Sequence, residues 1–312
     1  MSDKYSLKSM RDIEPVKILI TGLSGHGKTT SLEHIPEPEG VLYFDLDGKG
    51  LPFSRNSDGN TFQTFNIKKA EEGLKKRRAQ YNQLLRERKV QDNPYMKMSP
   101  SMFLMNAIQE FSALKNEDGT PKFHTFIIDT FSYLMTLFEI DIKKDEYTNK
   151  TSSGKVDGQA NWGQYKDFVS ETLLDVFSGL PQHIICLNHI NTDTGVAEVA
   201  GSWKHKTIES SFAHIVRSVK IEGMMFDTLK ENVKNDLLTY SQRDNFLNQK
   251  YAYKVLPHPD FDNFSERTPD GMFKIEFDPS GESNVPLVCE SFIDNDIMIY
   301  LSRWYEFSGQ NK

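Results

Sequence analysis

Gly22-Leu23-Ser24-Gly25-His26-Gly27-Lys28-Thr29 is the stretch of this sequence that decides its fold. It fits the pattern G-x-x-x-x-G-K-[ST] without a mismatch. The short apolar run Val16–Thr21 precedes it and is predicted to form a strand. The residues after Lys28 are predicted to open a helix that ends at Pro36 and Pro38. A strand, a glycine-rich loop and a helix in this order predict a phosphate-binding loop.

The residue types of this loop suit a nucleoside triphosphate. Glycines let backbone N–H groups turn inward around phosphate oxygens. We expect Lys28 to reach the terminal phosphates and the hydroxyl of Thr29 to ligate Mg²⁺. The adjoining Thr30 completes the expected contact surface. The sequence therefore predicts a site for ATP, or a similar triphosphate, together with Mg²⁺; the alternative is a glycine-rich turn that binds nothing.

Further apolar runs along the chain alternate with helical stretches. Strands are expected at Val41–Asp47, Thr61–Ile67, Phe123–Asp129, His183–Asn188, Ile215–Glu222 and Tyr251–Leu256, and helices at 68–89, 101–114, 131–142 and 164–177. The stretch 143–163 between two of these helices is polar and is expected to be a loop. The alternation predicts an α/β fold with a mostly parallel central sheet flanked by helices.

Carboxylates follow two of the predicted strands. Asp129 comes at the carboxyl edge of the sheet, where ligands of open α/β folds collect, so we expect it to support the Mg²⁺ held by Thr29. Its alternative role is a helix N-cap for the following segment. Asp45 and Asp47 end the second strand, and one of them could orient the attacking water. We assign that role to Asp47, while a tight turn at Asp47-Gly48 is the alternative.

The composition excludes several classes of protein. The chain has 312 residues, a formal net charge of −7, and two cysteines without the spacing of a zinc site or a disulfide framework. No stretch approaches the roughly 18 apolar residues of a membrane helix, and no apolar signal region begins the sequence. We therefore expect a cytoplasmic protein with no membrane partner. Because the net charge is acidic, any nucleic acid would have to meet a local basic patch.

The order of these motifs resembles the RecA-like ATPase core, especially the small RecA-like ATPases that bacteriophages encode beside single-strand annealing and recombination functions. The resemblance covers roughly residues 15–280 and includes a later strand that ends in Leu187-Asn188-His189-Ile190. It implies a Mg²⁺-dependent ATPase that acts on single-stranded DNA in phage recombination, annealing or replication, in the host cytoplasm. It also implies a homo-oligomer, either a ring or a filament, and a single-strand binding protein as a further partner.

The resemblance also implies roles for residues at the strand ends. Asp47 stands where RecA-type proteins have their catalytic carboxylate, which is a glutamate in RecA itself. His189, together with Asn188, stands where a polar residue senses the terminal phosphate. Histidine departs from the glutamine of RecA, and its alternative is a hydrogen-bonded strand-end histidine.

Two further sites follow from the resemblance. The loop Asn191–Lys206 would face DNA, with Trp203 stacking on a base and with Lys204 and Lys206 meeting phosphates. The alternative is that Trp203 packs locally and the lysines are solvated. Arg267 lies in a segment similar to the hairpin from which hexameric RecA-like ATPases extend an arginine into the neighbouring subunit's site. A serine stands where that hairpin has lysine, and the alternative for Arg267 is a surface turn.

The expected organisation is one main domain. It comprises an N-terminal extension at 1–14, a RecA-like ATPase core at 15–280 and a C-terminal tail at 281–312. The core would carry a basic helical insertion at about 68–114 and a C-terminal β-hairpin region that includes Met272–Phe277.

Two other functions remain open from the sequence. A nucleotide or small-molecule kinase would need an acceptor pocket and an arginine-bearing lid, and the strand end Asn188-His189 favours the RecA-like arrangement instead. A non-catalytic module would use the nucleotide only to switch the binding of a partner.

Overall fold

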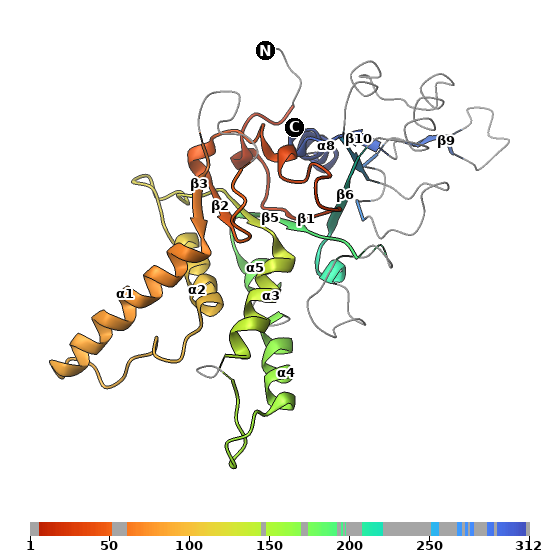
Figure 1. Cartoon of the computed structure of the whole chain (residues 1–312). Helices are drawn as coiled ribbons and strands as arrows, with labels where there is room; N and C mark the ends of the chain where they lie inside the picture. The colour runs from red at the N-terminus through yellow and green to blue at the C-terminus, as the bar shows by residue number, and fades with distance from the viewer. Residues whose placement is uncertain are drawn as a thin grey trace.

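An eight-stranded sheet is the centre of this protein in the computed structural model (Figure 1). The structure describes residues 6–51, 61–144, 148–169, 174–191, 195, 197, 208–220, 251–255, 267–269, 272–273, 275–277, 286–289 and 292–309. The strands of the sheet are β1 (Lys17–Thr21), β2 (Val41–Asp45), β3 (Gln63–Asn66), β4 (Thr125–Asp129), β5 (His183–Asn188), β6 (His214–Lys220), β7 (Tyr251–Lys254) and β10 (Phe292–Asp294). They lie in the order β10-β7-β6-β1-β5-β4-β2-β3. Strands β1 to β6 are parallel, whereas β7 pairs antiparallel with both β6 and β10.

The apolar runs of the sequence become strands that are covered on both faces. Every residue of β2, β4 and β5 is buried. Along β2, Leu42 and Phe44 belong to one apolar cluster, whereas Val41 and Tyr43 belong to another. Because successive side chains of a strand point to opposite faces, the two clusters lie on the two faces of the sheet. The predicted α/β fold with a mostly parallel sheet is therefore confirmed.

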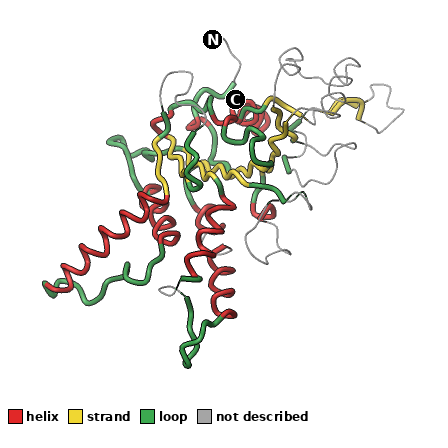
Figure 2. Tube along the Cα trace, in the orientation of Figure 1, coloured by secondary structure: helices red, strands yellow, loops and turns green. Residues whose placement is uncertain are grey.

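Helices cover the sheet unequally (Figures 1 and 2). Those drawn below it are α1 (Ile67–Arg86), α2 (Pro100–Ser112), α3 (Phe131–Ile142), α4 (Gly158–Asp167) and α5 (Asp175–Gly179), and α8 (Ile297–Ser308) lies above it. Short 3-10 turns are η1 (Met10–Asp12), η2 (Thr30–Leu32), η3 (Pro38–Gly40) and η5 (Ile208–Ser211), and β8 (Ile275–Phe277) pairs with β9 (Pro286–Cys289) in a separate sheet. None of the helices in the described part of the chain combines the length and apolar character of a membrane span.

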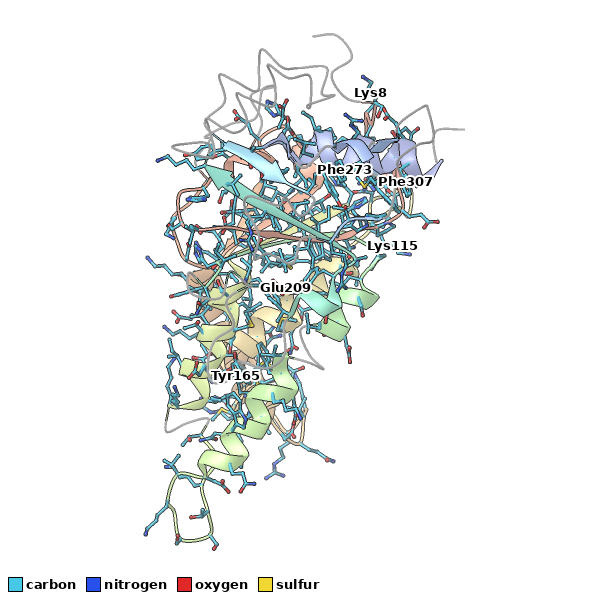
Figure 3. All side chains as sticks on the ribbon, turned by 90° about the vertical axis from the view of Figure 1, so that its right-hand side faces the viewer. Lys8, Lys115, Tyr165, Glu209, Phe273 and Phe307 are labelled. Carbon is cyan, nitrogen blue, oxygen red and sulfur yellow. The ribbon has the colours of Figure 1, made fainter. Side chains whose placement is uncertain are left out.

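The region after α3 differs from the prediction. The stretch 143–163, expected to be a loop, contains the start of α4. The helix expected at 164–177 is confirmed in its described residues, which lie at the end of α4, in π-helical turns at 168–169 and 174, and in α5. Asp157 caps α4 by accepting a hydrogen bond from the N–H of Ala160 at 2.9 Å. The buried ring of Tyr165, labelled in Figure 3, packs against Phe138 of α3 with ring centroids 6.3 Å apart. Packing on α3 therefore stabilises α4, whose first part at 158–163 is too polar to be predicted as helix from its sequence.

Both ends of the described chain belong to the apolar cluster that covers the upper face of the sheet. Leu7 is buried there, and its N–H donates to Oγ of Ser302 in α8 at 3.3 Å. Phe273 packs against Tyr300 of α8 with ring centroids 6.0 Å apart (Figure 3). The segments set apart in the sequence as an extension and a tail thus contribute residues 6–13 and 292–309 to the same fold.

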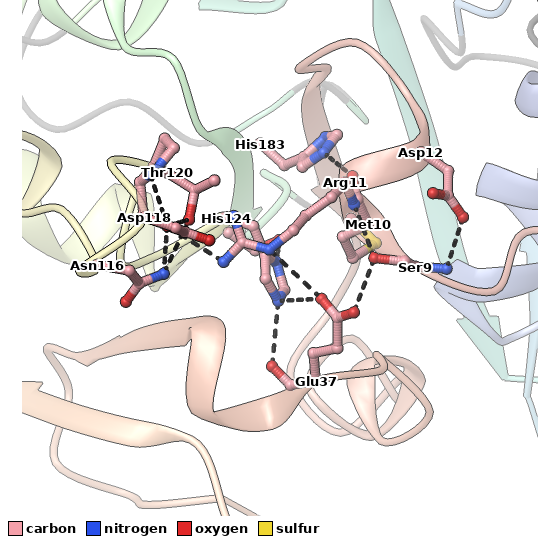
Figure 4. A network of polar contacts seen from close by, with 12 residues as sticks. Ser9, Met10, Arg11, Asp12, Glu37, Asn116, Asp118, Thr120, His124 and His183 are labelled. Atoms are coloured by element: carbon pink, nitrogen blue, oxygen red, sulfur yellow. Dashed lines mark hydrogen bonds and ion pairs between the residues drawn. The ribbon is translucent and has the colours of Figure 1, made fainter.

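A network of polar contacts holds the N-terminal turn η1 in place (Figure 4). Glu37 accepts a hydrogen bond from Oγ of Ser9 at 2.9 Å and pairs with Nε of Arg11 at 3.7 Å. The ring of His124 approaches the carbonyl oxygen of Glu37 at 3.1 Å. Nη2 of Arg11 also donates to the carbonyl of Pro121 at 3.1 Å, so η1 is tied to the segment that enters β4.

His183 at the start of β5 is held in its neutral form. The N–H of Val16 donates to Nδ1 at 3.2 Å, so Nε2 carries the proton and donates to the carbonyl of Met10 at 2.7 Å. Burial is the main cause that lowers the pKa of His183 to about 4. The folded protein therefore keeps His183 neutral at pH values near 6.5, where half of the unfolded chains carry a proton on this histidine.

This histidine predicts a loss of stability in mild acid. Because the folded-state pKa lies below the unfolded one, stability is complete above pH 6.5 and falls as the pH drops towards 4. Between pH 7.5 and pH 5 the contribution of His183 amounts to about 2 kcal/mol of unfolding free energy. Urea unfolding at both pH values should therefore give a smaller acid-dependent loss for His183→Gln than for the wild type. Equal losses in the two proteins would contradict this assignment.

Candidate functional site

The loop after β1 is shaped by its glycines. Gly25 and Gly27 have φ angles of 76° and 86°, in the left-handed region that favours glycine. A Cβ on Gly27 would also lie 2.7 Å from Cγ of Tyr251, and a Cβ on Gly22 would lie 2.6 Å from the carbonyl oxygen of Ser218. The loop therefore needs glycine for its backbone conformation and because β6 and β7 approach it closely.

A single 3-10 turn, η2, follows the loop where the sequence predicts a helix. The N–H of Ser31 donates to the carbonyl of Gly27 at 3.0 Å. Pro36 and Pro38 lack backbone donors, and η3 already begins at Pro38, so few residues remain for further helical turns. Phosphate binding here would therefore depend on the N–H groups of the loop and on Lys28 more than on a helix dipole.

Lys28 lies inside the loop with its ammonium group held by backbone oxygens. Nζ donates to the carbonyls of Gly22 at 2.7 Å and Leu23 at 2.9 Å. Burial lowers the pKa of Lys28 to about 8, and the nearby carboxylate of Asp129 opposes that shift. The group is therefore still mostly protonated at neutral pH, and it can supply positive charge to a phosphate.

Asp129, the last residue of β4, joins the loop to the sheet. Its Oδ2 accepts hydrogen bonds from Oγ1 of Thr29 at 2.8 Å and from the hydroxyl of Tyr43 at 2.7 Å. Burial raises the pKa of Asp129, while these two hydrogen bonds favour the ionised form. The structure thus brings together the two residues that the sequence predicts as magnesium ligands.

The alternative role of Asp129 as a helix cap does not hold. The N-cap residue of α3 is Thr130, whose Oγ1 accepts from the N–H of Tyr133 at 3.3 Å. Asp129 instead directs its carboxylate to Thr29 and Tyr43. Its side chain is therefore available to the site and is not used to end the helix.

The oxygen atoms of Thr29 and Asp129 fit a hard cation such as Mg²⁺. Mg²⁺ is typically held by one or two protein oxygens, with substrate phosphates and water completing its shell. No group of three or more His, Cys, Asp or Glu side chains suited to a metal occurs among the described residues. A hydroxyl and a carboxylate 2.8 Å apart are therefore an appropriate donor set for the magnesium of a magnesium–nucleotide complex.

The two acids at the end of β2 have different surroundings. Oδ2 of Asp45 accepts from the N–H of Gly50 at 3.2 Å, and burial raises the pKa of this buried carboxyl. Asp47 lines the cavity beside the loop, and its Oδ2 lies 2.7 Å from Nζ of Lys49. Both carboxylates thus accept a hydrogen bond from the turn after β2, since Oδ1 of Asp47 accepts from the N–H of Lys49 at 3.2 Å, but only Asp47 also lines the cavity.

His189 follows the end of β5, the strand between β1 and β4. Its Nδ1 lies 3.5 Å from Nζ of Lys28. Burial lowers the pKa of His189, and the positive charges of Lys28 and Lys49 lower it further. Asn188 donates from Nδ2 to the carbonyl of His189 at 2.8 Å, so it fixes the backbone at this strand end. The neutral ring of His189 can therefore exchange hydrogen bonds with a phosphate beside Lys28.

These side chains line one cavity of about 270 Å³ at the carboxyl edge of the sheet. Its lining residues are Ser24, Gly25, Gly27, Lys28, Thr29, Thr30, Asp47, Lys49, Gly50, Asp129, Thr130, His189 and Tyr251. A second cavity of about 370 Å³ shares four of them, Asp47, Lys49, Thr130 and His189, and adds Ser132, Tyr133 and Thr136 of α3. Six of the predicted loop residues thus meet Asp47, Asp129 and His189 of three strand ends in one place, whereas Gly22, Leu23 and His26 of the loop do not line this cavity.

Comparison with known proteins identifies the family. The model of the AAA domain family matches residues 14–219. The chain belongs to this family. Membership indicates a P-loop ATPase with nucleotide-dependent activity, in agreement with the cavity described above. No curated protein matches the chain.

The AAA domain match ends within β6, but later residues also contact the loop. Nδ2 of Asn295 donates to the carbonyl of Gly27 at 2.9 Å. Oγ of Ser218 lies within hydrogen-bond distance of two acceptors, Oδ1 of Asn295 at 2.7 Å and the carbonyl of His26, which share its single proton. The phosphate-binding loop of this AAA domain is therefore shaped in part by a segment beyond the family match.

The residues of the site that the sequence analysis missed include Tyr43, Lys49 and Tyr251. Tyr43 lies inside an apolar strand, where an aromatic residue predicts only packing. Lys49 could have been noticed, because Asp47-Gly48-Lys49-Gly50 places a cation in a glycine-rich turn directly after a strand end. Tyr251 comes from β7, far along the chain, and no local pattern connects it with the loop.

The remaining predicted site residues lie elsewhere. Arg267 exchanges backbone hydrogen bonds with Ile215 of β6, at 2.6 and 3.1 Å, and its side chain is exposed. It does not line either cavity, so its predicted action on a neighbouring subunit stays a prediction. Trp203, Lys204 and Lys206 lie outside the described residues.

The contact between Tyr43 and Asp129 predicts a role in turnover. Tyr43→Phe removes one of the two hydrogen bonds that orient the carboxylate, and such changes around a metal ligand typically cost about 10- to 100-fold. We expect the rate of Mg²⁺-dependent ATP hydrolysis to decrease by about 10- to 100-fold while the protein stays folded. Tyr300→Phe is the matched control, because it removes a buried hydroxyl that bonds to Nδ1 of His214 at 2.9 Å, away from the cavity. Equal turnover in the two variants would contradict the role of Tyr43.

Proposed function

We propose that this protein is a Mg²⁺-dependent ATPase of the RecA-like type that acts on single-stranded DNA in recombination, annealing or replication. The observation that carries the proposal is the cavity that gathers Lys28, Thr29, Asp129, Asp47 and His189. These residues supply a cation, two oxygen ligands, a carboxylate and a neutral imidazole around the expected position of a terminal phosphate.

Each residue of the cavity would have a distinct part in hydrolysis. The ammonium group of Lys28 neutralises negative charge on the phosphates. Thr29 and Asp129 would hold Mg²⁺, which supplies charge stabilisation as phosphoryl transfer proceeds. Asp47 would accept a hydrogen bond and then a proton from the attacking water, while the oxygen of that water forms a bond to the terminal phosphorus. The bond between the terminal phosphorus and the leaving ADP oxygen breaks, and ADP and phosphate are released.

The RecA-like part of the proposal is supported by the position of β5. This strand lies between β1 and β4, and it ends in Asn188 followed by His189 at the cavity. In the resemblance described above, a polar residue at this place senses the terminal phosphate and leads into a loop that faces DNA. The segment after His189 would then change its contacts with DNA according to whether ATP or ADP occupies the site. This step rests on the resemblance.

A basic surface for DNA is supported by α1. Between Ile67 and Arg86 this helix carries seven Lys or Arg residues and two Glu residues, in a chain with a net charge of −7. Arg78 is used structurally, because Nε and Nη2 donate to the carbonyls of Tyr95 and Met98, each at 2.9 Å. Lys75 and Lys76 are exposed and are better candidates for phosphate contacts.

The partners and the place of action follow from the same proposal. A homo-oligomer, as a ring or a filament in the cytoplasm, would let the exposed Arg267 act on the site of a neighbouring subunit. A single-strand binding protein would be a natural partner, since both proteins would meet the same DNA.

Phosphate release with and without single-stranded DNA tests the function directly. We expect Mg²⁺-dependent release of phosphate from ATP that increases when single-stranded DNA is added at low salt. If the rate of phosphate release is the same with and without single-stranded DNA, the protein would be an ATPase that acts on another target. ATP binding with no release would favour a nucleotide-switched binding module, and transfer of phosphate to an added nucleotide or small molecule would favour a kinase.

Substitutions in the loop Asn191–Lys206 should have two separable effects on the affinity for single-stranded DNA. Each neutralised phosphate of a single strand contributes about −0.7 to the log–log salt slope, so replacing Lys204 and Lys206 with alanine should flatten the slope by about 1.4. Trp203→Ala should instead cost about 1–3 kcal/mol of binding with the slope nearly unchanged, because stacking carries little salt dependence. The double variant Lys75→Ala with Lys76→Ala, measured in the same titration, tests whether α1 contacts the phosphates of DNA. No measurable affinity in the presence of ATP and Mg²⁺ at low salt would contradict the DNA proposal.

A further inference from the structure

Lys49 stands at the border between the two cavities. It lines both of them, together with Asp47, Thr130 and His189. Its Nζ lies 2.7 Å from Oδ2 of Asp47, and its backbone N–H donates to Oδ1 of the same carboxylate at 3.2 Å. The side chain of Lys49 is 67% exposed, whereas that of Asp47 is 14% exposed. A cation with room to move is therefore paired with the carboxylate that would orient water.

The border between the two cavities is a suitable position for the terminal phosphate in phosphoryl transfer. In phosphoryl transfer the attacking and leaving oxygens lie roughly in line on opposite sides of the terminal phosphorus. The first cavity contains the phosphate-binding loop, and the second opens towards α3 with Ser132, Tyr133 and Thr136 in its wall. A terminal phosphate at the border would thus have its leaving group on the loop side and space for the nucleophile on the other side.

We propose that Lys49 exchanges partners during turnover: its ammonium group pairs with Asp47 before a triphosphate binds and then moves to the terminal phosphate. The exchange leaves the carboxylate of Asp47 to accept a hydrogen bond from the attacking water. This inference rests on the proposed ATPase function and adds to it a residue that makes the site respond to the terminal phosphate.

The energetics favour such an exchange. An ion pair with an exposed lysine typically contributes little to stability, so Lys49 gives up little when it leaves Asp47. A terminal phosphate offers more negative charge and several acceptor oxygens, and lysine adapts to it with a flexible stem and three donors. Lys28 is less suited to this part, because its Nζ is already held by the carbonyls of Gly22 and Leu23.

The backbone around Lys49 also suits a movable side chain. Gly48 and Gly50 flank it, both with φ of 73°, and a Cβ on either glycine would meet no atom within 4 Å. The turn is therefore open on both sides of Lys49 and is not packed against the core. By contrast, Lys28 lies in a loop that Tyr251 and Asn295 approach closely at Gly27.

Lys143 provides a matched comparison elsewhere on the surface. Its Nζ lies 2.6 Å from Oε1 of Glu139, and its side chain is also 67% exposed. It follows the C-terminal end of α3 and lines neither of the two cavities. Lys49→Ala and Lys143→Ala thus remove similar ion pairs, and they differ in whether a phosphate could take the place of the carboxylate.

The test compares the affinities for a non-hydrolysable ATP analogue and for ADP, each with Mg²⁺, by calorimetry, alongside steady-state turnover. We expect Lys49→Ala to weaken binding of the triphosphate analogue about tenfold or more, because a hydrogen bond to a charged group is lost, while ADP affinity stays the same. Turnover should fall by a similar or larger factor, and Lys49→Arg should restore most of both. Lys143→Ala should match the wild type in every measurement.

A complementary variant separates the two partners of the pair. Asp47→Asn frees Lys49, so it should bind the triphosphate analogue at least as tightly as the wild type and lose hydrolysis. If Lys49→Ala keeps the wild-type ratio of triphosphate to ADP affinity while the wild type hydrolyses ATP, the partner exchange is overturned and the ATPase function stands. A wild type that does not hydrolyse ATP overturns both.

Discussion

The carboxylate of Asp129 is the contact on which the site depends. Its Oδ2 accepts hydrogen bonds from Thr29 in the phosphate-binding loop and from Tyr43 in β2. The loop follows β1, which is separated from β4 by β5, so the bond from Thr29 joins strands that are not neighbours, whereas the bond from Tyr43 joins the neighbouring strands β2 and β4. A buried carboxylate is costly unless hydrogen bonds satisfy it, and therefore the two hydroxyls stabilise the position that a magnesium–nucleotide complex needs.

The opposite side of the loop is held by the antiparallel part of the sheet. Tyr251 approaches Gly27, and Asn295 donates to the carbonyl of the same glycine. These residues lie beyond the AAA domain match, yet they restrict the loop as closely as residues within it. The loop is therefore clamped between Asp129 and the C-terminal elements, and a change in either would alter how it meets phosphates. Lys49 differs from both, because its glycine-flanked turn leaves it free to respond to a ligand.

The sequence predicted the parts of the site that obey general rules of α/β folds. The loop motif, the parallel sheet and the meeting of Asp47, Asp129 and His189 follow because the carboxyl ends of parallel strands share one edge. Tyr43 and Tyr251 were missed because their roles arise from tertiary contacts that local patterns do not encode. The helix expected after Lys28 is one 3-10 turn, since the prolines that end it come too soon.

Lys28 and its loop are the part of the site that would bind the phosphates of a nucleoside triphosphate. Calorimetric titration of Mg²⁺ and a non-hydrolysable ATP analogue into wild-type protein and into Lys28→Ala tests this binding most directly. We expect saturable binding by the wild type and a large loss of affinity in Lys28→Ala, because the phosphates lose the ammonium charge. The variant also loses the hydrogen bonds to the carbonyls of Gly22 and Leu23, so cooperative thermal unfolding is measured to show that it is folded. Equal affinity in a folded Lys28→Ala protein would contradict this role of Lys28.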